Sequence, residues 1–256
     1  MIPLSADIVD RFYTFLWPLI RIAAALMTAP VLALEAANAR VRLILALVLA
    51  WLVFPLVEWP RIDPLSADGL LAIFNQIAIG ILMGLTLQIV VAAIMVGGQA
   101  ISSTMGLSMD NLMDHNFGNV PVLSQFLMVL GVLVFLALGG HLLLIQTLVE
   151  SFRVLPVGQS LAGTEPIGRL IAWSAMMFLG AVLLALPVLV TLLLVNVGVG
   201  IITRAAPSLN IFSVGFPAMM LSGFVLLLVC MSSVGWRLQW LWMQGLDRMR
   251  YVLGIN

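Results

Sequence analysis

Residues 170–202, LIAWSAMMFLGAVLLALPVLVTLLLVNVGVGII, decide the fold class of this chain. The stretch has no charged residue and no alternation of period two, so in lipid it predicts a helix and not a barrel strand. A helix of this length would be about 50 Å long, whereas the hydrocarbon core of a bilayer is about 30 Å thick. Pro187 removes one helical hydrogen bond, so we expect a kink or break there, with two helical pieces that could form a hairpin.

Five further apolar segments lie on either side of this one. The whole chain is 63% hydrophobic and 9% charged, which makes lipid its natural solvent. The fold class is therefore all-α and membrane-associated. The segments are residues 12–34, 41–57, 70–96, 122–149 and 211–236.

The charges carry information about topology but not about partners. Eleven basic residues, all of them arginine, balance eleven acids, so no nucleic-acid surface is expected. The arginines of alternate loops favour a cytoplasmic location for both termini. Two acids precede the first arginine, so no cleaved signal peptide is expected.

Several polar residues lie within or beside the apolar segments. They should face protein or water, because exposure to lipid would be costly. Interhelical hydrogen bonding is the preferred interpretation, and a pore lining or proton relay is the alternative. These residues are Arg21, Asn75, Gln76, Gln88, Gln99, Gln125, His141, Gln146, Glu150, Asn196 and Arg204.

Glycines mark sites of close helix packing or of helix interruption. Gly80 and Gly84 lie four residues apart, and Gly198 and Gly200 form a second small face, so both pairs are expected to contact neighbouring helices. The pairs at residues 97–98 and 139–140 could either unwind a helix or admit a neighbour's backbone. Cys230, inside an apolar run, is expected to be a small buried hydrophobe.

The longest polar interruption in mid-chain is MGLSMDNLMDHNFGNVP, residues 105–121. Asp110, Asp114 and His115 could bind a metal ion, although such residues are also ordinary in solvated loops, and we expect no metal or other cofactor. The chain has no recognisable catalytic motif, so it is not expected to be an enzyme.

Three stretches resemble the FliR family of flagellar export proteins, whose injectisome counterparts share the pattern. They are GLTLQIVVAAIMVGGQAISSTMGLSMDN, QFLMVLGVLVFLALGGHLLLIQTLVESF and ALPVLVTLLLVNVGVGIITRAAPSLNIFSVGFP. The last is the most specific, because it keeps several residues in the family's order. They are Pro187, Asn196, Gly198, Arg204, Pro207, Asn210, Phe212, Gly215 and Pro217.

The resemblance implies a subunit of the type III export gate, which passes unfolded flagellar proteins across the bacterial inner membrane at the flagellar basal body. Its implied partners are FliP-like and FliQ-like subunits in a helical hetero-oligomer, FlhB-like and FlhA-like proteins, the exported chains and membrane lipid. Residues 1–165 would form a FliP-like half, and residues 166–256 a FliQ-like hairpin and tail. Assembly and packing would involve Gly80, Gly84, Pro187, Asn196, Gly198, Arg204, Pro207, Asn210 and Pro217.

The resemblance also implies that the loop at residues 106–120 plugs the pore. Methionine is apolar, unbranched and soft enough to seal around varied side chains, and Gly106 and Gly118 could serve as hinges. The alternative is that the methionines fill gaps against neighbouring helices. The implied plug residues are Met105, Gly106, Leu107, Ser108, Met109, Asp110, Asn111, Met113, Asp114, His115, Phe117 and Gly118.

A second function stays open at this point. A six-span secondary transporter or channel for a small solute would need binding groups near broken helices, for which Asn196, Gly198 and Gly200 are the candidates.

Overall fold

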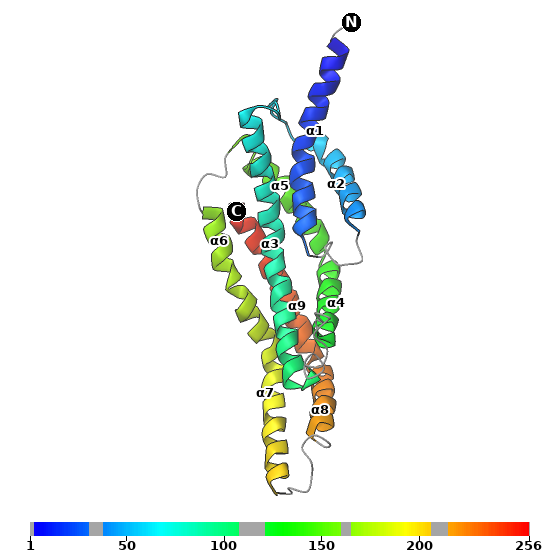
Figure 1. Ribbon diagram of the computed structural model, residues 1–256, viewed down its shortest axis with the longest axis vertical. Coiled ribbons are helices and arrows are strands. Elements are labelled where there is room, and N and C mark those ends of the chain that lie inside the picture. The colour runs from blue at the N-terminus through cyan, green and yellow to red at the C-terminus, as the bar shows by residue number, and fades with distance from the viewer. Residues whose placement is uncertain (1–2, 31–37, 108–120, 160–164, 206–214, 256) are drawn as a thin grey trace. The chain divides into compact units, whose positions relative to one another are not determined.

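The computed structural model describes residues 3–30, 38–107, 121–159, 165–205 and 215–255, with side chains described from residue 11 onward. These residues form helices and no strand, which confirms the all-α prediction (Figure 1). The helices are α1 (Pro3–Thr28), α2 (Ala39–Val53), η1 (Phe54–Leu56), α3 (Ala67–Thr104), α4 (Val122–Ala137), α5 (Gly140–Val154), α6 (Glu165–Ser174), α7 (Met176–Ala205), α8 (Phe216–Val229) and α9 (Met231–Val252).

The sequence has six apolar segments of unequal length, and the described helices vary accordingly. Three stretches are long and apolar enough to cross a membrane: Ala39–Leu56, Ala67–Thr104 and Glu165–Ala205. Two bent pairs, α4 with α5 and α8 with α9, pass the same test together and raise the number to five. Helix α1 carries Arg11 and Arg21 and is not among these spans.

The break between α4 and α5 follows from a glycine pair. Gly139 has φ of +68°, a left-handed conformation that ends α4, and the two helices meet at a bend of 65°. The pair at residues 97–98 does the opposite, because α3 continues through it. A Cβ atom added to Gly97 would approach the Ala181 carbonyl oxygen, and one added to Gly98 would approach Ser124. The glycine pair at residues 139–140 therefore interrupts a helix, and the pair at residues 97–98 lets neighbouring segments approach a continuous one.

The predicted break at Pro187 is wrong. Helix α7 runs through Pro187, and the segment is interrupted at Ala175 between α6 and α7 instead. Leu184 and Val188 are both fully buried on either side of the proline, so packing supports the continuous helix there. A proline in an apolar helix is tolerated where neighbouring helices compensate for the lost hydrogen bond.

Cys230 lies at a helix break and not inside a helix. It ends α8, and α9 starts one residue later at a bend of 64°. Its side chain is half-buried, so the prediction of a small buried hydrophobe is only partly correct.

The chain divides into two compact units, and α3 and α9 contribute to both. Unit 1 comprises Met1–Ile89, Gly139–Ser174 and Gln244–Asn256, and unit 2 comprises Val90–Leu138 and Ala175–Met243. Each unit draws on sequence from both sides of residue 165, and the predicted FliP-like and FliQ-like halves stay a prediction.

In unit 1, α1 packs against α2 and α3 (Figure 1). Part of its core consists of Trp17, Ala72 and Val157, with Trp59 and Ile62 packed beside them. The Trp59 ring lies edge-on to Phe152 at 5.1 Å between centroids, which joins the loop after η1 to α5.

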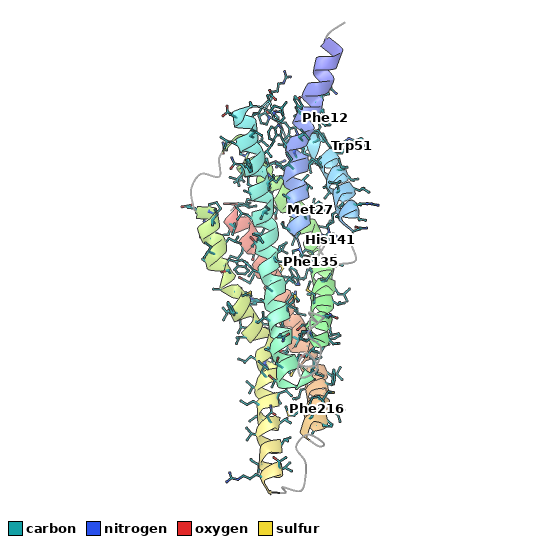
Figure 2. The ribbon with its side chains drawn as sticks, in the orientation of Figure 1. Phe12, Met27, Trp51, Phe135, His141 and Phe216 are labelled. Carbon is teal, nitrogen blue, oxygen red and sulfur yellow. The ribbon has the colours of Figure 1, made fainter. Side chains whose placement is uncertain are left out.

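In unit 2, α4 packs against α9 through Gly131. Trp242 donates from Nε1 to the Gly131 carbonyl oxygen at 2.8 Å, and its ring lies 4.6 Å from that of Phe135. Figure 2 shows Phe135 on α4. The missing side chain at Gly131 gives Ile94 and Trp242 room to meet the α4 backbone. A buried indole with its N–H satisfied is a stable element of a helix interface.

Candidate functional site

The predicted plug loop begins in unit 2, at the end of α3. Met105 is completely buried, and its Sδ atom would lie 2.8 Å from a Cβ placed on Gly223 of α8. Gly106 has φ of +83°, which an L-residue adopts only with strain. The start of the loop is therefore fixed in two ways: Met105 packs where Gly223 has no side chain, and the turn at Gly106 requires glycine.

An apolar cavity of about 460 Å³ lies where the loop leaves and rejoins the described chain. Leu107 borders it on one side of the loop, and Val122 borders it on the other. The remaining lining comes from α4, α8 and the start of α9. It consists of Leu123, Phe126, Phe224, Leu227, Leu228 and Met231.

Most of the predicted loop residues lie outside the described part of the chain. Met105, Gly106 and Leu107 are described, but Ser108, Met109, Asp110, Asn111, Met113, Asp114, His115, Phe117 and Gly118 are not. Elsewhere, the described residues contain no group of three His, Cys, Asp or Glu that could hold a metal ion.

Replacing Gly106 with alanine is expected to lower the free energy of unfolding by about 1–2 kcal/mol, because its φ is left-handed. Gly235→Ala is the matched control in the same unit. Gly235 lies inside α9 with open space around its Cα, so alanine should stabilise the helix by about 0.5–1 kcal/mol. Denaturation in detergent measures both variants, and equal effects would contradict the turn's role.

A buried arginine joins three helices of unit 1. Arg21 is fully buried in α1, and its Nε donates to Gln76 Oε1 of α3 at 2.7 Å. Its two terminal nitrogens donate to Ser151 Oγ at 3.0 Å and to the Leu155 carbonyl oxygen at 2.7 Å. The guanidinium carbon lies 4.1 Å from the centre of the Phe152 ring. We call these residues the Arg21 cluster.

All the acceptors of the Arg21 cluster are neutral. A buried charge is costly unless hydrogen bonds satisfy it, and here the fork of the guanidinium reaches three oxygens and an aromatic face. Gln76 turns its oxygen toward Arg21, and its own buried Nε2 has no hydrogen-bond partner among the described residues. The cluster thus fixes how α1, α3 and α5 pack in unit 1.

Gly80 and Gly84 bring α3 against α1 on the same side as the cluster. A Cβ on Gly80 would lie 2.6 Å from the Arg21 carbonyl oxygen, and one on Gly84 would collide with Thr28. The close approach depends on the absence of side chains at both positions.

Four of the other predicted assembly residues lie on a largely uncovered surface of unit 2. Asn196 and Arg204 are exposed on α7, no described atom lies within 4 Å of a Cβ added to Gly198, and Pro217 is exposed at the start of α8. Pro207 and Asn210 lie outside the described residues. The exposed apolar side chains here include Leu193, Leu194, Val197, Ile201 and Ile202 of α7, and Leu221, Val225, Leu228 and Val229 of α8.

Of the polar residues singled out in the apolar segments, only Arg21 and Gln76 are fully buried. Asn75 and Glu150 are half-buried, and Glu150 pairs with Arg250 at 3.2 Å. The remaining glutamines and His141 are exposed on this single chain.

The sequence did not indicate the residues that fix the start of the loop. Gly223 and Phe216, which border Met105 and Gly106, are more than a hundred residues away along the chain. The only local signal for Gly223 is a glycine inside an apolar run, which is typical of helix packing in general.

These features define a helical membrane protein with much of its apolar helix surface uncovered by its own chain. Residues 12–245 match the family described as bacterial export proteins, family 1. The flagellar biosynthetic protein FliR of Escherichia coli K12 is 35% identical over 221 residues, covering 86% of this chain and 85% of the relative. That of Bacillus subtilis 168 is 32% identical over 232 residues, covering 89% and 90%. The chain belongs to the FliR family of bacterial export proteins.

Proposed function

We propose that this chain is a structural and gating subunit of the type III export gate, which passes unfolded flagellar proteins across the bacterial inner membrane. The family match over residues 12–245 carries the proposal, since the named relatives are flagellar biosynthetic proteins. In this role the protein acts by assembly and not by catalysis. Its place is the flagellar basal body, and flagellum assembly depends on it.

The uncovered apolar surface of α7 and α8 supports the proposal that the protein functions as part of a hetero-oligomer. Outward apolar residues such as Leu194 and Ile201 need lipid or partner helices around them, while exposed Asn196 and Arg204 on the same helix need polar partners. FliP-like and FliQ-like subunits would supply both, and FlhB-like and FlhA-like proteins would complete the apparatus. A FliP-like half and a FliQ-like half in the chain would match such neighbours.

The loop at residues 106–120 is the proposed plug of the gate. Its described start is fixed by Met105 and Gly106, and the chain on both sides of it borders one apolar cavity. A loop whose two ends both border an apolar cavity can move its methionines into the constriction of the gate and out of it again.

A six-span transporter is not favoured, because its candidate residues are not near a broken helix. Asn196, Gly198 and Gly200 lie inside the continuous helix α7.

Purification from the native membrane tests the proposal. The tagged chain is expected to be recovered with FliP-like and FliQ-like subunits in unequal copy number, counted by native mass spectrometry. Variants of Pro207 and Asn210 should lose these partners. A chain that is monodisperse alone and moves a small solute in liposomes would contradict the proposed function.

A further inference from the structure

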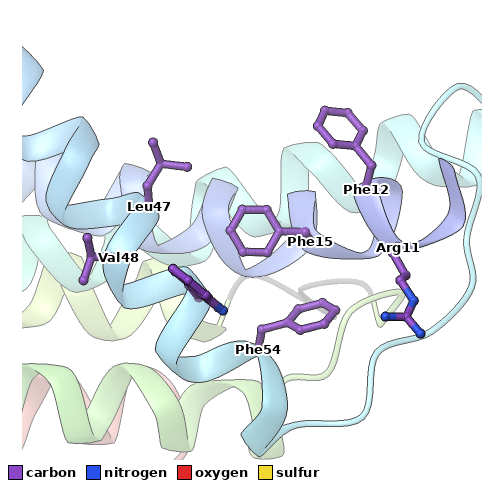
Figure 3. Close-up of a pocket in the computed structure, with 7 residues that line it drawn as sticks. Arg11, Phe12, Phe15, Leu47, Val48 and Phe54 are labelled. Atoms are coloured by element: carbon purple, nitrogen blue, oxygen red, sulfur yellow. The ribbon is translucent and has the colours of Figure 1, made fainter. Parts of the chain in front are cut away.

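A groove on unit 1 lies between α1 and α2 and has no role in the proposed gate. It is a wide, open groove with a volume of about 490 Å³, and it is bordered by Arg11, Phe12, Phe15, Leu47, Val48, Trp51 and Phe54. Figure 3 shows Phe15 and Phe54 in the middle of this groove, with Leu47 and Val48 toward one end and Arg11 at the other. We call it the α1–α2 groove.

The α1–α2 groove is polar at one end only. Arg11 is exposed and borders the groove. Phe12, the next residue along α1, is 60% exposed, and Trp51, one turn of α2 away from both Val48 and Phe54, is 76% exposed (Figure 2). Aliphatic side chains follow. The order of cation, aromatic rings and aliphatic chain is the order of groups met on entering a bilayer from water.

The outer face of α2 requires an apolar environment. The span Ala39–Leu56 has a mean hydropathy of 2.0, and only 22% of it is buried by the rest of the chain.

The groove suits a lipid better than a helix of another protein. A helix is about 10 Å across with its side chains, so a hollow of about 490 Å³ admits only about one turn of it. A flexible acyl chain can fill the same hollow along its length. A partner helix would also need an acid placed at Arg11, whereas an anionic phospholipid brings its phosphate and its acyl chain together.

We propose that the α1–α2 groove binds an anionic phospholipid. The phosphate lies on Arg11, and an acyl chain runs past Phe15, Phe54 and Trp51 to Leu47 and Val48. The site concerns this chain's own surface and does not depend on the proposed export function.

Photo-labelling tests the site on the full chain with whatever subunits co-purify. The protein is reconstituted in bilayers with a trace of diazirine-bearing phosphatidylglycerol or of the matching phosphatidylcholine, and labelled peptides are identified by mass spectrometry. We expect phosphatidylglycerol to label residues 43–54 about fivefold more than phosphatidylcholine, the preference that one arginine near an anionic headgroup provides.

Three variants locate the preference. Arg11→Gln should reduce labelling by phosphatidylglycerol to the level of phosphatidylcholine. Arg61→Gln is the matched control, because Arg61 is an exposed arginine of the same unit that borders other pockets and not this groove, so the preference should persist. Val48→Trp should block the groove and reduce labelling by both lipids. The thermal midpoint and the subunit composition establish that each variant is folded.

Several results would overturn the proposal. Equal labelling by the two lipids in the wild-type protein would remove the charge preference, and an unchanged preference in Arg11→Gln would remove Arg11 from the site. If photo-crosslinkers placed at Leu47 and Trp51 capture a co-purified subunit and no lipid, the groove is a protein interface instead.

Discussion

Arg21→Ala is expected to lower the free energy of unfolding by about 3–5 kcal/mol, the cost of removing one partner from a buried charged network. The substitution leaves the Gln76 Oε1, Ser151 Oγ and Leu155 carbonyl oxygens without their donor and opens a cavity beside Phe152. Denaturation in detergent measures the change, and the amount of folded protein in the membrane should fall in parallel.

Two further variants separate charge from shape in the Arg21 cluster. Arg21→Lys keeps the charge but cannot reach three acceptors with one ammonium group, so it should restore only part of the stability. The double variant Arg21→Met with Gln76→Leu removes the charge together with its main acceptor. It should be more stable than Arg21→Ala, because methionine fills the space beside Phe152 and one acceptor, Gln76 Oε1, is removed together with its donor, although the Ser151 Oγ and Leu155 carbonyl oxygens still lose theirs.

Arg153→Ala is the control for a general effect of losing an arginine. Arg153 is exposed on α5, the helix that supplies Ser151, so its loss should change stability by less than about 0.5 kcal/mol. If Arg21→Ala is equally mild, the cluster does not hold the three helices of unit 1 together.

The sequence predicted the helices but not most of their interruptions. Continuous apolar runs without period-two alternation require helices in lipid, and this expectation holds for every described segment. Whether a glycine or a proline breaks such a helix depends on what packs beside it. Gly139 has open space and ends α4, whereas Pro187 is flanked by buried Leu184 and Val188 and does not end α7.

The contacts of the Arg21 cluster could not be predicted from the sequence, for a different reason. Arg21 was noted as a polar residue needing protein or water around it, and it is buried in protein. Its partners, however, are 55, 130 and 134 residues away along the chain, and no local pattern connects them. Such contacts follow from the tertiary packing of whole helices, which hydropathy and residue spacing do not specify.

Deleting residues 108–116 is expected to raise the ion conductance of the membrane by more than tenfold, if the proposed plug is correct. The deletion should leave assembly intact, because the packed residues Met105, Gly106 and Phe216 are all retained. The four residues that remain before Pro121 give about 17 Å of extended chain from Leu107, which suits two ends that border one cavity. Conductance is measured in planar bilayers containing the purified complex.

The size of the leak distinguishes a plug from a mere filler. Met109→Ser with Met113→Ser keeps the loop length and removes only the soft apolar groups, so it should leak less than the deletion but more than the wild-type complex. Asp110→Asn with Asp114→Asn is the matched control, which alters polar residues of the same loop and should leave conductance low. A deletion complex that assembles normally and conducts no more than the wild type would leave the loop without a sealing role. The methionines would then be gap-fillers against neighbouring helices, and the seal would have to come from another part of the assembly.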